Sequence, residues 1–198
     1  MSRTALLYLF TEFGPIVVFF AAGRLTDFYT AVAYFIAATV LACLFAWWRA
    51  KQVPVIPLVS AVFVIVGGLL TLLYDAPDAI IFADTLYYVL TAIVLGFSLW
   101  KTQGRFLQRL FNPVFALTPY GWKLLTRRWL LLLICAAVFN EIVRQTASPG
   151  FWIDYRFYKT IVITAFALYQ FTLSRQHRVL GESNAWGIRT RPAQKKTH

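Results

Sequence analysis

An acidic residue inside an apolar run is the feature of this sequence with the clearest chemical potential. Glu12 lies near the middle of the apolar run 5–22 and is followed by Gly14 and Pro15. An ionised carboxylate at the centre of a membrane helix costs about 2.5 to 3.5 kcal/mol, so it must be paired, hydrated or protonated. Pro15 also frees the carbonyl of Thr11, which leaves polar backbone beside the acid. Glu12 is therefore either a structural hydrogen-bonding residue, which we favour, or a proton or cation relay.

A second set of polar residues lies near predicted helix ends. Glu141 and Arg144 are three residues apart, which puts them on one helical face, and Asn140 is adjacent. We interpret Glu141 and Arg144 as a satisfied pair at the membrane interface. Three further charged residues lie within about a turn of an outer helix end, where an aspartate is near water and a long basic side chain can reach it: Asp84, Lys159 and Arg24.

The sequence shows no constellation for catalysis or metal binding. Both histidines, His177 and His198, lie near the carboxyl end, and no serine, histidine and acid set is spaced for nucleophilic catalysis. Metal-ligand spacing is also missing from the sequence. We therefore expect a protein that is not an enzyme and that needs no metal or cofactor.

The composition indicates a membrane protein. Of the 198 residues 60% are hydrophobic and only 14% are charged, with a mean hydropathy of +0.64. A soluble domain carries about 25% charged residues, and an intrinsically disordered chain has low hydrophobicity. Two cysteines are too few for a disulfide scaffold in a chain of this length. We predict an all-α, polytopic membrane bundle.

The apolar runs set the predicted spans. A helix needs about 20 apolar residues to cross a bilayer, and six segments come close: 5–22, 28–48, 55–74, 80–100, 129–147 and 157–173. The first is short and is interrupted by Glu12 and Pro15, so five spans with a re-entrant first segment and six spans both remain open. We expect the bundle to cover residues 1–178, and the basic tail 179–198 to be disordered.

The charge distribution predicts the orientation. The net charge is +11, from 19 basic and 8 acidic residues. If all six segments cross from a cytoplasmic amino terminus, 15 basic residues lie inside and four outside, which satisfies the positive-inside rule. We therefore predict a multi-pass protein of a bacterial inner membrane with both termini in the cytoplasm. The expected partners are anionic inner-leaflet lipids, and not nucleic acid.

The basic stretch 101–128 contains a candidate lipid-binding element. Arg105 and Arg109 fall on one helical face, and mostly apolar residues fall on the other, which is typical of a short interfacial helix. An equally favoured alternative is a basic loop whose only role is to set the orientation of the chain in the membrane. The basic residues that we expect to face lipid are Arg105, Arg109, Lys123, Arg127 and Arg128.

Three stretches of the sequence resemble a known family. The first runs from Phe13 to Phe20 and on through Leu25–Tyr29 to Thr39, the second from Gly121 through Trp129 to Val143, and the third from Phe151 to Arg156. Together they resemble the intracellular septation protein A family, of the YciB and IspZ type, over about residues 10–178. One departure is Ile80–Thr85, which stands where such proteins usually show Ile-Lys-Trp-Lys-Pro-Thr.

The resemblance implies an inner-membrane protein with a role in septation, envelope biogenesis and envelope integrity. It also implies contacts with membrane proteins of the division or elongation machinery. The competing hypothesis is a small transporter or channel that uses Glu12. The candidate functional or structural polar positions are Glu12, Pro15, Asp27, Tyr29, Asn140, Glu141, Arg144, Trp152 and Arg156.

Overall fold

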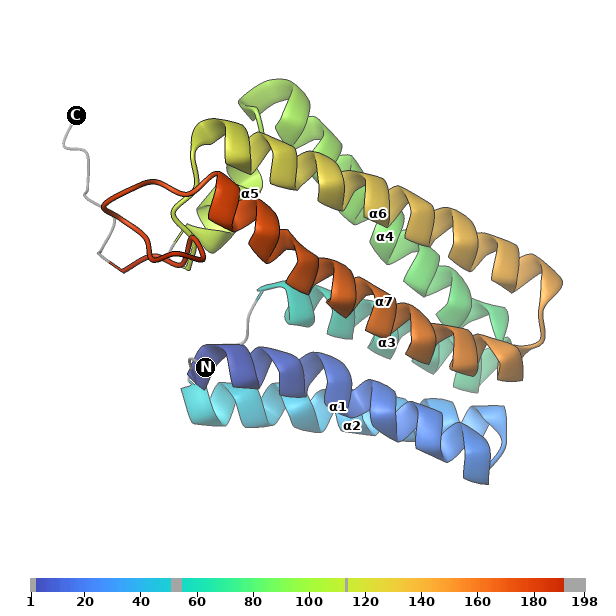
Figure 1. Cartoon of the computed structure of the whole chain (residues 1–198). Helices are drawn as coiled ribbons and strands as arrows, with labels where there is room; N and C mark the ends of the chain where they lie inside the picture. The colour runs from blue at the N-terminus through green and yellow to red at the C-terminus, as the bar shows by residue number, and fades with distance from the viewer. Residues whose placement is uncertain (1–2, 51–54, 113, 191–198) are drawn as a thin grey trace. The chain divides into compact units, whose positions relative to one another are not determined.

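The computed structural model describes residues 3–50, 55–112 and 114–190, with side chains described for 13–49, 58–112 and 114–190 (Figure 1). The regular elements in these residues are helices, which confirms the all-α prediction. They are α1 (Arg3–Leu25), α2 (Phe28–Ala50), α3 (Val55–Tyr74), α4 (Asp78–Thr102), α5 (Arg105–Phe111), α6 (Pro119–Thr146) and α7 (Pro149–Gln176). Pro15 lies within α1, which continues through it as one helix.

Two helices begin earlier than the apolar runs do. The apolar runs predict helices at 129–147 and 157–173, but α6 begins at Pro119 and α7 at Pro149. Proline suits the first turn of a helix because its missing N–H is not needed there. The preceding hydroxyl residue caps each start: Thr118 Oγ1 accepts from Gly121 N at 3.1 Å, and Ser148 Oγ accepts from Phe151 N at 3.3 Å.

The basic stretch 101–128 is mostly helical, and the expected short helix within it is α5. Gly104 precedes α5 with φ of 88°, a left-handed conformation that favours glycine. Leu107 is buried, whereas Arg105 and Arg109 are exposed. The helix is therefore amphipathic, as its sequence indicates.

The chain divides into two compact units, which are described separately. Unit 1 contains residues 1–87 and 136–161, and unit 2 contains residues 88–135 and 162–198. In unit 1, α1 and α2 lie side by side (Figure 1). Its core is aromatic at the centre, because Phe19 stacks on Phe35 at 4.7 Å and meets the edge of Trp152 at 5.7 Å between ring centroids.

Glycines allow close helix contacts within unit 1. A β-carbon added at Gly23 of α1 would lie 2.6 Å from Cδ1 of Ile153, and one added at Gly67 of α3 would lie 2.5 Å from Cβ of Ala83. Small residues let helix backbones approach one another in membrane bundles. These glycines therefore set how closely α1 approaches α7 and how closely α3 approaches α4 inside this unit.

In unit 2, part of the carboxyl-terminal tail is ordered, which differs from the predicted disorder. Val179 N donates to Ala116 O at 2.9 Å, and Arg189 N donates to Val114 O at 2.8 Å. The Arg189 guanidinium also donates to both oxygens of Asn112, each at 2.8 Å. The physical reason is that Asn112 and residues 114–118 offer backbone hydrogen-bonding groups outside any helix, and the tail pairs with them. Residues 191–198 of the predicted tail lie outside the described residues.

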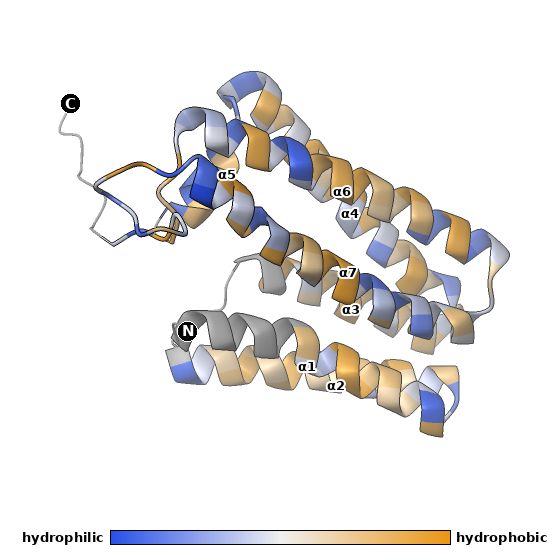
Figure 2. Cartoon of the chain, viewed as in Figure 1, coloured by the Kyte–Doolittle hydropathy of each residue, from blue (hydrophilic) through white to orange (hydrophobic). Residues whose placement is uncertain are grey.

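The helices expose large apolar side chains, as expected for a protein surrounded by lipid. Leu41, Leu73 and Ile93 are 65%, 74% and 60% exposed. Figure 2 shows apolar residues along the length of α2, with hydrophilic residues near its ends. Among the described residues two helices are long and apolar enough to cross a membrane, Phe28–Arg49 and Asp78–Thr102. The count of five or six spans stays a prediction.

Candidate functional site

Three charged side chains are buried together in unit 1. Asp84 of α4 is 6% exposed, and Arg156 and Lys159 of α7 are 7% and 9% exposed. Arg156 and Lys159 are three residues apart, so they share one face of α7. Burying a charge is costly unless it is paired and hydrogen-bonded, and the pairing here is close.

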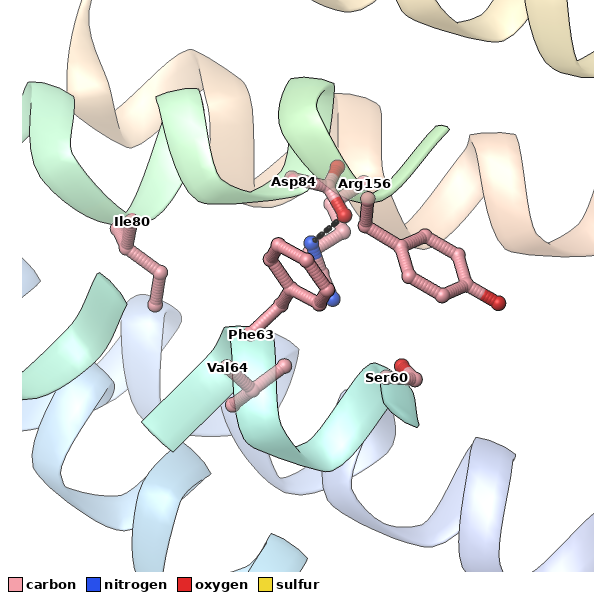
Figure 3. Close-up of a pocket in the computed structure, with 7 residues that line it drawn as sticks. Ser60, Phe63, Val64, Ile80, Asp84 and Arg156 are labelled. Atoms are coloured by element: carbon pink, nitrogen blue, oxygen red, sulfur yellow. Dashed lines mark ion pairs between the residues drawn. The ribbon is translucent and has the colours of Figure 1, made fainter. Parts of the chain in front are cut away.

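Asp84 accepts from both bases. Its Oδ1 lies 2.5 Å from Arg156 Nη1, and its Oδ2 lies 2.5 Å from Lys159 Nζ (Figure 3 shows the Arg156 pair). Each carboxylate oxygen therefore has its own cation, and the carboxylate bridges two successive turns of α7. Both are charge-assisted hydrogen bonds, which are stronger than hydrogen bonds between neutral groups.

Asn140 of α6 completes the buried polar cluster, which we define as Asp84, Thr85, Asn140, Trp152, Arg156 and Lys159. The Asn140 amide nitrogen donates to Ile81 O at 3.0 Å and to Thr85 Oγ1 at 2.8 Å. Its carbonyl oxygen accepts from Trp152 Nε1 at 3.2 Å and from Lys159 Nζ at 3.0 Å. Asn140 is fully buried and its side chain makes four hydrogen bonds, so it ties together the parts of α4, α6 and α7 that belong to unit 1.

Aromatic rings enclose the two cations. The Arg156 guanidinium carbon lies 5.0 Å from the centre of the Phe35 ring and 5.2 Å from that of the Trp152 ring. Lys159 Nζ lies 4.9 Å from the centre of the Tyr155 ring. Cation–π contacts of this kind strengthen when the cation is removed from water. The aromatic core of unit 1 therefore contributes to holding the charges in place.

A small cavity of about 10 Å³ adjoins the cluster. Asp84 and Arg156 supply its charged wall, and the other lining residues are Ser60, Phe63, Val64, Ile80 and Tyr87 (Figure 3). A cavity of this volume holds about one sphere of the size of a water molecule. Nε of Arg156 is buried and has no hydrogen-bond partner in the described part of the chain.

The cluster corrects the expectation for Asp84 and Lys159. Both were expected near an outer helix end in reach of water, but both are buried and paired with each other. The physical reason is that α7 begins at Pro149, so Lys159 lies ten residues inside the helix and faces α4 and α6. Arg24 is exposed, as expected, and donates to Asp154 at 2.8 Å.

The structure brings three of the sequence candidates into the cluster, namely Asn140, Trp152 and Arg156. Glu141 and Arg144 lie outside it and form a bidentate pair, with N–O distances of 2.9 and 2.6 Å. Pro15 is buried in α1. The side chain of Glu12 lies outside the described residues.

Asp27 and Tyr29 lie at the start of α2. Asp27 Oδ1 accepts from Tyr29 N at 2.9 Å and from Thr30 N at 3.0 Å, so Asp27 caps the helix. The hydroxyl of Thr30 donates to the other carboxylate oxygen, and this bond holds the pKa of Asp27 below its usual value. Asp27 therefore acts at one helix terminus, whereas the Tyr29 hydroxyl also interacts with Asp75, in the connection between α3 and α4.

The candidate lipid-facing basic residues all belong to unit 2. Arg105, Arg109 and Arg127 are exposed, and Lys123 is half-buried. Arg128 is also half-buried, and its Nη1 donates to Gln170 Oε1 at 3.3 Å. Three exposed guanidinium groups are therefore accessible on this unit.

The arrangement of the cluster fits a structural site better than a catalytic one. The polar side-chain atoms of Asp84 and Asn140 and the Lys159 ammonium are engaged in the pairs given above, and no nucleophile with an adjacent base appears in the cluster. The described residues hold no group of three or more metal-binding side chains.

Comparison with known proteins gives a consistent result. The family model described as "Intracellular septation protein A" matches residues 7–179. The "Inner membrane-spanning protein YciB" of Nitrobacter hamburgensis is 35% identical over 175 residues, which is 88% of this chain and 87% of the relative. The protein of the same name from Afipia carboxidovorans is 36% identical, over 88% of this chain and 87% of the relative. The one from Acidithiobacillus ferrooxidans is 34% identical, over 82% of this chain and 89% of the relative. No solved structure matches the chain.

Proposed function

Because this chain belongs to the intracellular septation protein A family, we propose that it acts in septation, envelope biogenesis and envelope integrity in a bacterial inner membrane. The observation that carries the proposal is the family match over nearly the whole chain, residues 7–179. The relatives carry names that describe membrane-spanning proteins and not enzymes. The protein acts as a multi-pass component with both termini in the cytoplasm.

The proposed mode of action is contact with membrane proteins of the division or elongation machinery. Such contacts need a side-chain surface within the bilayer. Helix α2 offers such a surface, because Leu41, Leu44 and Trp48 are 65%, 55% and 66% exposed. Helix α6 offers Phe139 at 60% exposure. In lipid, such helix faces associate through close packing and not through the hydrophobic effect. The fit between the two helix surfaces therefore determines which membrane protein binds.

Photocrosslinking in living cells tests this mode of action. A photoreactive phenylalanine analogue is placed at the exposed positions Leu41, Leu44 and Phe139, one at a time. Phe35, which is 2% exposed, is the matched control because the analogue replaces an aromatic ring that only the chain itself contacts. We expect crosslinks to a division or elongation protein at an exposed position and none at Phe35. Adducts with lipid alone at all three exposed positions would contradict the proposed contacts.

We also propose that unit 2 holds anionic lipids. By sequence, unit 2 carries twelve basic residues and a single acid, Glu182, whereas unit 1 carries seven of each, so the net charge of +11 belongs to unit 2. Each basic residue near an anionic membrane surface adds about 1 kcal/mol of attraction. The exposed residues Arg105, Arg109 and Arg127 support this role.

Nanodiscs of defined composition test the lipid proposal. Replacement of Arg105, Arg109, Arg127 and Arg128 by glutamine should reduce the enrichment of phosphatidylglycerol around the protein. It should also weaken the orientation of the neighbouring helices, because positive charge holds a loop in the cytoplasm. Unchanged lipid enrichment and unchanged topology in this variant would reduce the basic stretch to a passive connector.

A further inference from the structure

The ordered part of the tail in unit 2 folds back onto the end of α7. Gly187 is buried with a φ of 77°, and a β-carbon at this position would lie 2.7 Å from the carbonyl oxygen of Ser174. Glycine tolerates both this conformation and this close approach. The carbonyl oxygen of Gly187 also accepts from Ala116 N at 3.0 Å. The tail is therefore held between the last turn of α7 and the connection that precedes α6.

Hydrogen bonds within the tail fix the backbone around Trp186. Asn184 Oδ1 accepts from Trp186 N at 2.9 Å and from Ile188 N at 3.1 Å, as asparagine does in tight turns. Arg178 Nη1 donates to Ala185 O at 3.1 Å. The position of the Trp186 indole is therefore set by the fold of the tail.

Two large apolar side chains of the ordered tail are exposed. Trp186 is 51% exposed and Leu180 is 79% exposed. The guanidinium carbon of Arg175, in the last turn of α7, lies 5.7 Å from the centre of the Trp186 ring. An exposed indole beside a basic side chain is typical of the membrane interface, because the ring meets the acyl chains and the cation reaches the headgroups.

The end of α4 repeats this arrangement in the same unit. Trp100 is 72% exposed, and Lys101 Nζ lies 4.7 Å from the centre of its ring. Trp100 belongs to Asp78–Thr102, one of the two described helices that are apolar enough to cross a membrane. Phe106 N donates to Ser98 Oγ at 3.1 Å, which ties α5 to the end of α4. Because the tail pairs with the connection that follows α5, the tail and the end of α4 lie at the same end of unit 2.

We propose that the ordered tail 177–190 is a membrane-interface anchor, which inserts Trp186 and Leu180 into the boundary between headgroups and acyl chains at this end of unit 2. The proposal rests on the membrane location and orientation proposed above, in which this boundary belongs to the inner leaflet. Burial of apolar area drives the insertion, so it occurs in uncharged lipid as well. The anchor therefore holds the end of α7 and the start of α6 at a fixed depth.

Fluorine NMR of the full-length protein in phosphatidylcholine nanodiscs tests the anchor. The seven tryptophans are replaced by fluorotryptophan, and their resonances are assigned by changing one tryptophan at a time to phenylalanine. A lipid that carries a nitroxide near its headgroup relaxes indoles at the interface. We expect the relaxation of Trp186 to be within about twofold of that of Trp100. Trp122, which is 1% exposed, should be relaxed several-fold less than either.

Three results would overturn the anchor, and they differ in what they imply. If the lipid nitroxide relaxes Trp100 but only a water-soluble gadolinium chelate relaxes Trp186, the tail faces water and its apolar side chains are left for a protein partner. If Trp186 is relaxed only after phosphatidylglycerol is added, the contact is electrostatic and does not come from apolar burial. If the lipid nitroxide relaxes neither tryptophan, the membrane location of this end of unit 2 is wrong, and the proposed function fails with it.

Two glycines of the tail form a matched pair of variants. Both have positive φ, 77° at Gly187 and 86° at Gly181, but a β-carbon at Gly181 would meet nothing within 4 Å. Gly187→Ala should displace the tail from α7 and reduce the relaxation of Trp186 by the lipid nitroxide, with that of Trp100 unchanged. Gly181→Ala introduces the same backbone strain without the clash and should keep the relaxation of Trp186. Equal relaxation of Trp186 in Gly187→Ala and the wild type would contradict an anchor positioned by the fold of the tail.

Discussion

Asp84 links α4 to α7 because its two oxygens receive different cations from one helix face. Buried ion pairs add little net stability over well-packed apolar residues, since the cost of desolvation offsets the attraction. Removing one partner is different, because the other partner is left charged and buried. The cluster therefore specifies one helix arrangement within unit 1 more than it stabilises the fold in absolute terms.

This argument predicts a large effect for a nearly isosteric substitution. Asp84→Asn removes the carboxylate charge that Arg156 and Lys159 share and should lower the free energy of unfolding by about 3 to 5 kcal/mol. Asp154→Asn is the control, because it breaks the exposed pair with Arg24, and should cost about 0 to 1 kcal/mol. Reversible unfolding in mixed micelles measures both values. An equal decrease in the free energy of unfolding in Asp84→Asn and Asp154→Asn would show that burial does not increase the cost of losing the carboxylate.

Glu12 separates the structural hypothesis from the transporter hypothesis. If Glu12 is a hydrogen-bonding residue, Glu12→Gln keeps its size and polarity and should complement a deletion strain under envelope stress. Glu12→Leu should lower protein abundance, since unsatisfied polar groups near Thr11 cost about 1 to 3 kcal/mol. Quantitative immunoblotting and growth at low osmolarity measure the two effects. A stable and abundant Glu12→Gln protein that fails to complement would favour proton or cation transfer.

The sequence identified half of the buried polar cluster. The family resemblance points to Asn140, Trp152 and Arg156, and Asn140 also adjoins the Glu141–Arg144 pair. The positions of Asp84 and Lys159 near helix ends instead predict that both lie near water. Position along one helix cannot reveal a partner on another helix, and Asp84 and Lys159 are 75 residues apart. The available signal was the pair of bases three residues apart in an apolar helix, which requires an acid elsewhere in the bundle.

At the scale of elements, the apolar runs predict where helices lie better than where they begin. Helix α3 has the predicted bounds, Val55–Tyr74. Helices α6 and α7 begin ten and eight residues earlier than predicted, because their first turns are polar and aromatic and do not raise the hydropathy. The Thr118–Pro119 and Ser148–Pro149 pairs indicate the true helix starts. In each pair a capping residue precedes a proline that suits the first helical position.

Two adjacent glycines give a matched test of the packing of α3. A β-carbon at Gly67 would lie 2.5 Å from Cβ of Ala83 and 3.0 Å from Cα of Ile80, so part of the clash is with backbone. At Gly68 the neighbours are side-chain atoms alone, Cδ1 and Cγ1 of Ile36 at 2.7 and 2.9 Å and Cγ1 of Val32 at 3.3 Å. Gly67→Ala should therefore cost about 1 to 3 kcal/mol of unfolding free energy, and Gly68→Ala less. Thermal unfolding in detergent compares them, and a larger loss at Gly68 would contradict the close contact between α3 and α4.

At the scale of the whole molecule, the distribution of charge predicts the orientation. With the net charge in unit 2, the positive-inside rule puts the connections of that unit in the cytoplasm. A reporter fused at Asp78 should then read external, and one at the carboxyl terminus should read cytoplasmic. A cytoplasmic reading at Asp78 or an external tail would contradict the orientation. An external amino terminus with a cytoplasmic tail would show that residues 5–22 do not span.

The central claim is that the protein serves septation and envelope integrity as a membrane component, and not as a transporter. The most direct measurement is the distribution of cell length and envelope permeability in a deletion strain at low osmolarity, with and without the wild-type chain at its native level. We predict misplaced or delayed septa and a leaky envelope in the deletion strain, with both restored by the wild-type chain. Normal septa and an intact envelope in the deletion strain, together with a change in solute flux alone, would contradict the claim.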